Sequence, residues 1–153
     1  LRQQVQPSSP RIGWVIASAE GSTGGYNLRK LASSLQRRQQ RARQLRGQDG
    51  LAADELWRVW EDASQFRATA DEFWPAGRDA ARSCLASGRR EEGRQRLRHV
   101  LGILCAFGLH QRAAACLARA SDELTDQEVL GHLQAVGPPP ALVRLLPNEV
   151  WRR

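Results

Sequence analysis

The chain has 153 residues, of which 41% are hydrophobic and 25% charged, the length and balance of one ordinary globular domain. A chain of this length buries about two-thirds of the surface of its unfolded form, so the composition excludes wholesale disorder. The longest apolar run, 100–109, has ten residues, whereas a membrane-spanning helix takes about 20.

The excess positive charge of the chain lies entirely in its first third. The formal net charge is +7. Residues 1–50 hold eight Arg and one Lys against two acidic residues, whereas residues 51–153 hold fourteen Arg against fourteen acidic residues. Between residues 21 and 48 there is no acidic residue at all. A one-sided field of this kind indicates a polyanionic partner: a nucleic acid, a phospholipid surface or an acidic protein.

The cysteines and the start of the chain bear on where the protein works. Cys84, Cys105 and Cys116 are odd in number and form no close pairs, which favours a reducing compartment. No signal-peptide pattern is present, so we expect an intracellular protein, cytoplasmic, nuclear or inside a virion. The sequence contains no Met and begins with Leu1, from which we expect an excised domain or a processed product.

Residues 1–26 are predicted to form an extended arm that ends in a Gly-rich loop, ahead of a helical domain at 27–153. The β-branched and aromatic stretch 12–17 is the one convincing strand candidate of the sequence. The Gly-rich stretch 21–25 lies between this strand candidate and a helix, as phosphate-binding loops do. It lacks the Lys that a P-loop requires, so we interpret it as a connector.

The helical domain begins with a basic amphipathic helix predicted at 27–47, with Asn27 as its N-cap and Gly47 as its stop. Its apolar residues recur at helical spacing at Leu28, Leu31, Leu35, Ala42 and Leu45. Its basic residues are the candidate nucleic-acid-binding residues of the chain: Arg29, Lys30, Arg37, Arg38, Arg41, Arg43 and Arg46. An apolar seam with a basic back suits a helix that packs on one side and meets phosphates on the other.

The helical body is predicted at 51–146. Pro75 is expected to end its first helix, and Gly88 and Gly108 are expected to end two others. A capping box at 125–128 predicts the start of another helix. The predicted helices are 51–74, 76–87, 91–107, 110–120, 125–136 and a last turn or two at 141–146.

These elements predict an all-α fold of five to seven helices packed as antiparallel hairpins, preceded by the extended arm with its short strand-like segment. The stretch 84–97 is echoed by 105–117: in each, a helix ends at a Gly turn that is followed by a small residue and a Leu. This repeated pattern of helix, glycine turn, small residue and leucine resembles that of tetratricopeptide-like and other α-solenoid proteins. The spacing here is about 20 residues rather than 34 and the aromatic positions of that family are absent, so the resemblance implies hairpin packing only.

The sequence offers no catalytic signature. His99, Cys105, His110 and Cys116 are spaced six, five and six residues apart, whereas zinc sites use tight Cys or His pairs. We interpret them as buried cysteines and surface histidines. No nucleophile elbow, HExxH motif or kinase signature is present. We therefore expect a protein that is not an enzyme and has no cofactor, no metal and no small-molecule substrate.

The preferred function is a non-catalytic helical subunit or domain of a larger assembly that binds RNA or DNA through the Arg-rich helix. That helix resembles an arginine-rich RNA-binding segment, which implies a viral packaging or matrix-like protein or a ribonucleoprotein subunit. The alternative is an α-solenoid-like scaffold domain that binds only other proteins. Other subunits or further copies of the chain are expected partners under both, and a membrane surface is a weaker candidate. Trp is enriched at interfaces, and the candidate interface residues are Trp14, Trp57, Trp74 and Trp151.

Overall fold

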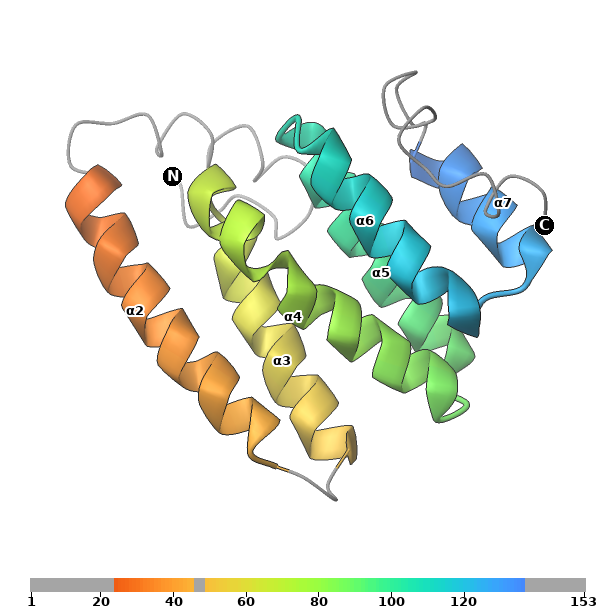
Figure 1. Cartoon of the computed structure of the whole chain (residues 1–153), viewed down its shortest axis with the longest axis horizontal. Helices are drawn as coiled ribbons and strands as arrows, with labels where there is room; N and C mark the ends of the chain where they lie inside the picture. The colour runs from red at the N-terminus through yellow and green to blue at the C-terminus, as the bar shows by residue number, and fades with distance from the viewer. Residues whose placement is uncertain (1–23, 46–48, 137–153) are drawn as a thin grey trace, which may run out of the picture.

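The computed structural model describes residues 24–45 and 49–136, and in this part of the chain it is entirely helical (Figure 1). The predicted all-α class is therefore confirmed for these residues. The strand candidate 12–17 and the last predicted turn at 141–146 lie outside them. The elements are α2 (Gly24–Arg43), α3 (Asp49–Ala63), α4 (Arg67–Ala86), α5 (Arg90–Ala106), α6 (His110–Ala120), the 3-10 turn η2 (Ser121–Glu123) and α7 (Asp126–Val136).

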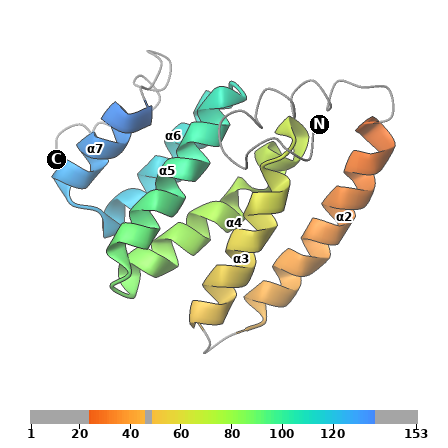
Figure 2. The ribbon, with the colours of Figure 1, turned by 180° about the vertical axis from the view of Figure 1, so that it is seen from behind.

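The helices form a row in which neighbours in sequence are neighbours in space from α2 to α6 (Figures 1 and 2). Helices two apart also touch: α2 contacts α4, α4 contacts α6, and α5 contacts α7. Helix α4 is the centre of the molecule because it packs against α2, α3, α5 and α6. Helices α2 and α7 stand at opposite ends of the row (Figure 1).

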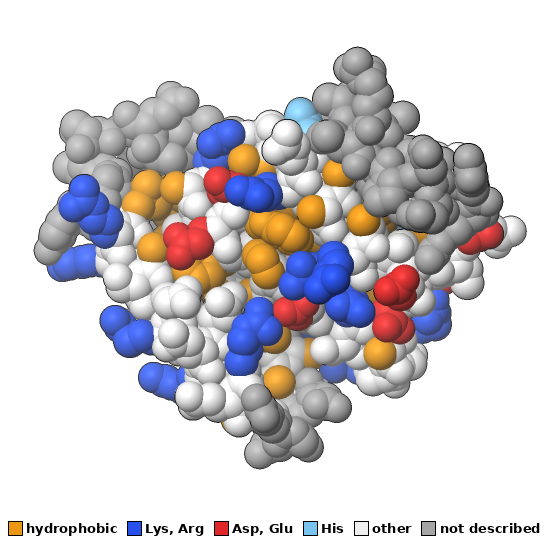
Figure 3. Space-filling view, viewed as in Figure 1, with side chains coloured by type: hydrophobic (Ala, Val, Ile, Leu, Met, Phe, Trp, Pro, Cys, Tyr) orange, Lys and Arg blue, Asp and Glu red, His pale blue; other side chains and the backbone are white. Residues whose placement is uncertain are grey.

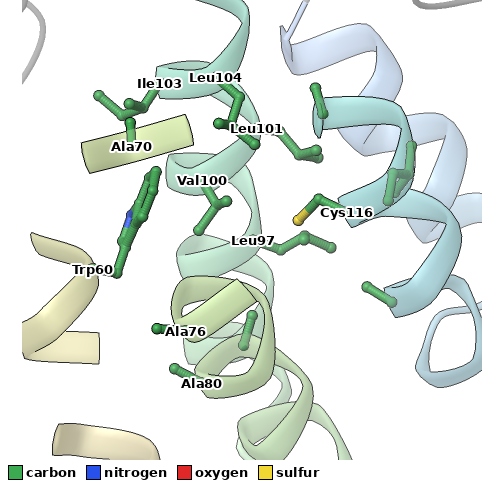
Figure 4. Close-up of a cluster of buried hydrophobic side chains, with 14 of the residues drawn as sticks. Trp60, Ala70, Ala76, Ala80, Leu97, Val100, Leu101, Ile103, Leu104 and Cys116 are labelled. Carbon is green, nitrogen blue, oxygen red and sulfur yellow. The ribbon is translucent and has the colours of Figure 1, made fainter. Parts of the chain in front are cut away.

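The core centres on Trp60, which is completely buried where α3, α4 and α5 meet (Figure 4). Helix α4 contributes small residues to this core, among them the fully buried Ala76 and Ala80. Gly77 is required there, because a Cβ at this position would lie 2.7 Å from Val100 Cγ2 and 2.8 Å from Trp60 Cγ. Small side chains on α4 thus let two helices approach it closely.

The stop and start signals of the later helices are confirmed. Gly88 and Gly108 follow α4 and α5 with φ of 88° and 76°, a left-handed conformation that glycine adopts without strain. The capping box also forms: the Thr125 hydroxyl accepts from the Glu128 N–H at 3.2 Å, and the Glu128 carboxylate accepts from the Thr125 N–H at 3.0 Å. Helix α7 begins at the next residue, Asp126.

The predicted break at Pro75 is wrong. The first helix of the body ends at Ala63, and Pro75 lies inside α4. Side-chain hydroxyls cap the helix end at this break: Thr69 Oγ1 donates to the Ala63 carbonyl at 2.6 Å, and Ser64 Oγ donates to the Glu61 carbonyl at 2.8 Å. They satisfy carbonyls at the end of α3 that the helix leaves open. Packing of α4 on its neighbours outweighs the cost of a proline inside a helix, about 3 kcal/mol.

The ends of the basic helix also differ from the prediction. Helix α2 begins at Gly24, three residues before the expected N-cap Asn27, and ends at Arg43, short of Gly47. Gly24 and Gly25, the residues of the expected Gly-rich loop that the structure describes, therefore belong to the helix. Gly47 itself lies outside the described residues. Local capping signals were weaker guides here than the apolar stripe, which packs against the core.

Candidate polyanion-binding face

Helix α2 lies at one edge of the molecule and attaches to it by its apolar stripe (Figures 1 and 2). Leu35 is completely buried and Ala42 is 2% exposed, and both belong to the main core. Leu31 and Ala32 pack against the same core from a partly buried position. The contacts are with α3 and α4. This leaves the opposite side of α2 facing solvent from Asn27 to Arg43.

Four of the predicted binding residues lie on the solvent side: Arg29, Lys30, Arg37 and Arg41 are all exposed. They span about 18 Å of helix axis at 1.5 Å per residue. Helix α2 contains no Asp or Glu, so none of its own residues offsets their charge. Figure 3 shows basic side chains spaced down the edge of the molecule that α2 forms. The structure thus brings these four cations together on one face.

Two further predicted residues pair with acids of the helical body. Arg38 Nη1 lies 2.5 Å from Asp62 Oδ2 on α3, and Arg43 Nη2 lies 3.0 Å from Asp79 Oδ2 on α4. Asp79 is shared with Arg78, whose Nε lies 3.0 Å from Oδ1. These two arginines tie α2 to its neighbours and contribute less to its outward field. The seventh predicted residue, Arg46, lies outside the described residues.

The rest of the described chain has the opposite balance. Residues 49–136 hold eleven Arg against fourteen acidic residues, whereas residues 24–45 hold six basic residues and no acid. Most arginines of the body are engaged with acids; Arg112, for example, lies 2.9 Å from Asp71. The charge asymmetry of the sequence is therefore concentrated on a single helix at the edge of the fold.

Two of the four tryptophans that were predicted to lie at interfaces are described by the structure, and both pack into the helical body. Trp57 and Trp74 are half-buried and pack against the core. The guanidinium of Arg96 lies 5.2 Å from the Trp57 ring, and that of Arg78 lies 5.1 Å from the Trp74 ring. Trp14 and Trp151 lie outside the described residues. The remaining exposed edges of Trp57 and Trp74 are what an interface could use.

The cysteines have the character of structural residues. All three are free, and Cys84 and Cys116 are buried. Burial raises the pKa of Cys116 to about 12 and also raises the pKa of Cys84 and Cys105, so the thiols stay protonated at neutral pH. A protonated thiol is a poor nucleophile and a poor metal ligand. No group of three metal-binding side chains occurs among the residues that the structure describes.

The prediction of a surface histidine is wrong for His99. Its Nδ1 accepts a hydrogen bond from Trp60 Nε1 at 3.0 Å, and the Trp57 ring packs edge-on with ring centres 5.5 Å apart. Burial lowers the pKa of His99, which keeps the ring neutral and able to accept this bond. His99 therefore satisfies the indole N–H of the central core residue. Sequence could not show this, because the two residues are 39 positions apart.

Comparison with known proteins assigns no family and no function to this chain. None of the described helices is both long enough and apolar enough to span a membrane. No family model, no curated protein and no solved structure matches the chain.

Proposed function

We propose that the protein is a non-catalytic helical subunit of a larger assembly that binds the backbone of a nucleic acid through the solvent face of α2. The observation that carries this proposal is the exposed row Arg29, Lys30, Arg37 and Arg41 on a helix that contains no acidic residue and whose other side is anchored in the core. The anchored side holds the row in place, so binding does not have to order the helix first.

The chemistry of the row favours phosphates as its ligands. Guanidinium groups form bidentate hydrogen bonds to phosphate oxygens, and cations spread over about 18 Å of helix suit a ligand with repeating charge. The neighbours on this face are neutral polar residues such as Gln36 and Gln40. Backbone contacts of this kind position a nucleic acid without reading its bases. We therefore expect binding with little sequence preference and a strong dependence on salt.

Fluorescence anisotropy with a labelled single-stranded RNA, repeated from low to high salt, tests the proposal. The test variant changes Arg29, Arg37 and Arg41 to Gln. Each phosphate contact contributes about 0.7 to the slope of log affinity against log salt for single strands, so the variant should lower that slope by about 2. Its far-UV circular dichroism should remain that of the wild type, because all three residues are exposed.

A matched control separates the α2 face from net charge. Arg58, Arg112 and Arg119 are also exposed, and changing them to Gln removes the same charge from other helices. The control variant should keep most of the affinity. An equal loss in both variants would contradict the proposed face, and absence of RNA binding by the wild type at low salt would overturn the function.

The alternative of a protein-binding scaffold is favoured by the helix row itself. Contacts between neighbours and between helices two apart are typical of the two-layer stacks of α-solenoids, and we infer antiparallel hairpin packing from them. A scaffold would use surfaces such as the exposed edge of Trp57. Under this alternative, Trp57→Ala should weaken association with a partner or a second copy in sedimentation experiments, and the α2 variant should leave association unchanged.

A further inference from the structure

An open pocket of about 490 Å³ lies between α5 and α7, at the end of the helix row away from α2 (Figure 1). Arg94 and Arg98 of α5 form one side. Thr125, Gly131 and His132 belong to the other side, from the N-cap and the body of α7. An ideal Cβ built on Gly131 meets no atom within 4 Å, so the wall is open at that position.

His132 lines this pocket with unsatisfied hydrogen-bonding groups. The residue is 1% exposed, and neither ring nitrogen has a hydrogen-bond partner in the described structure. A buried polar group without a partner costs about 1–3 kcal/mol, and native proteins leave few of them. The cost is removed if a ligand in the pocket supplies the missing partner.

Among the described residues, the charges around His132 include one guanidinium that forms no salt bridge. The Glu128 carboxylate lies 2.9 Å from Arg94 and 2.5 Å from Arg90, and it also accepts from the Thr125 N–H. Burial raises the pKa of Glu128, but these hydrogen bonds outweigh burial and lower the pKa to about 2. Arg98 is exposed and forms no salt bridge with any other described residue, although its charge interacts with the Glu91 carboxylate on the same helix.

We propose that this pocket is a binding site for a small oxyanion of the phosphate class, held by the Arg98 guanidinium and by the His132 ring. A phosphate offers several acceptor oxygens, which suit both a fork of N–H donors and an imidazole N–H. Arg94 lines the same pocket, but its guanidinium lies 2.9 Å from Glu128 and 2.6 Å from Glu91, so these two carboxylates already offset its charge. The α7 N-terminus lies at the same pocket, and the carboxylates of Asp126 and Glu128 in its first turn already compensate its helix dipole.

The proposal predicts coupling between anion and proton binding. Burial, followed by the charges of Arg98 and Arg94, lowers the pKa of His132 to about 4, although Glu128 on its own helix acts in the opposite direction. A bound anion would oppose the field of the two arginines and raise this pKa. Protons and anion then bind together, so affinity rises as pH falls from neutrality towards about 4.

The test is a pH titration of the histidine ring protons by NMR, with and without inorganic phosphate. The chain has three histidines, and His132→Gln identifies the resonance of interest. An opposite charge at about 4–6 Å shifts a pKa by about 1–3 units, so saturating phosphate should raise the pKa of His132 by at least about 1 unit. Sulfate, whose charge is constant above about pH 3, should bind more tightly as pH falls.

Two variants block the site in different ways. Arg98→Gln removes the exposed cation from the pocket wall, and Gly131→Leu fills the open wall of the pocket; both should abolish the shift. Arg119→Gln, an exposed change on α6, should leave the shift intact. A His132 pKa that phosphate does not change in the wild type would overturn the proposal, as would shifts that persist in both blocking variants.

A second arm distinguishes a free phosphate from the end of a nucleic acid, and it keeps this site separate from the α2 face. A 5′-phosphorylated RNA should bind more tightly than its 5′-hydroxyl form if the site takes a terminal phosphate, and equally if it takes the free anion. The α2 variant with Arg29, Arg37 and Arg41 changed to Gln should retain the phosphate-induced shift. Failure of RNA binding would therefore leave this site standing.

Discussion

Helices α2 and α5 are both rich in arginine, and the fold uses them in opposite ways. Helix α5 carries Glu91 and Glu92 beside its arginines, and these arginines reach acids on other helices: Arg96 lies 2.9 Å from Asp54, and Arg94 lies 2.9 Å from Glu128. On α2 there is no acid, and four of the basic side chains face solvent. The number of arginines on a helix therefore does not decide their role. An arginine that lies close to an acidic side chain holds the fold together, whereas one without such a neighbour adds positive charge to the surface.

The largest expected effect is a loss of stability in acid that comes from the α5–α7 end. His132 is neutral when folded, with a pKa of about 4, whereas an unfolded histidine titrates near 6.5. The contribution of His132 to the free energy of unfolding, up to about 3 kcal/mol, is fully present above about pH 6.5. It is lost as the pH falls to about 4. Urea unfolding at a series of pH values measures this. Helix α2 contains no Asp, Glu or His and adds nothing to the effect.

His132→Gln should flatten the stability profile between those pH values, apart from a smaller slope due to His99, whose pKa burial also lowers. An unchanged slope in the variant would show that the acid sensitivity lies elsewhere. Below this window the low pKa of Glu128, about 2, should cause a further loss that the variant retains.

Replacing one arginine on each helix tests the comparison directly. Arg96 is 8% exposed, pairs with Asp54 and lies over the Trp57 ring. Arg96→Ala should lower the free energy of unfolding by about 2 kcal/mol, less than a fully buried pair because Asp54 is 42% exposed. Arg37→Ala on α2 should change it by less than about 0.5 kcal/mol. Equal effects in chemical denaturation would break the distinction between the two helices.

Two glycines of α5 report how closely that helix is packed. A Cβ on Gly93 would lie 2.7 Å from Leu85 Cγ and 3.0 Å from the Ala81 carbonyl oxygen, so Gly93→Ala should destabilise by about 1–2 kcal/mol. Gly102 on the same helix has open space around it. Gly102→Ala should stabilise by about 0.5–1 kcal/mol through helix propensity. Thermal unfolding of both variants would reveal a looser α5 if Gly93→Ala were neutral.

The smallest expected effect concerns the paired arginines of α2. A double-mutant cycle on Arg38 and Asp62 should give a coupling of about 0.5 kcal/mol, because the Asp62 side chain is 53% exposed. Asp62→Asn frees Arg38 and removes a nearby negative charge, so it should increase affinity for single-stranded RNA by a few-fold. A decrease in affinity would mean that the pairing with Asp62 positions the binding face.

Sequence alone determined the features that depend on residues a few positions apart. The apolar stripe through Leu31 and Leu35 identified the buried side of α2, and Gly88 and Gly108 identified two helix ends. The capping box at 125–128 identified a helix start. The absence of acids on α2 is also a sequence property, because a helix displays on its surface whatever charges its own residues supply.

Only the tertiary structure decided which polar groups meet across helices. Arg38 pairs with Asp62, which lies 24 positions away in sequence, and Trp60 pairs with His99, which lies 39 positions away. No local sequence pattern encodes such pairs. Tertiary packing also outweighs the cost of Pro75 inside α4, and it leaves the ring of His132 without a hydrogen-bond partner among the described residues. Helix ends and faces follow from short-range geometry, whereas pairing and burial follow from the docking of helices that are distant in sequence.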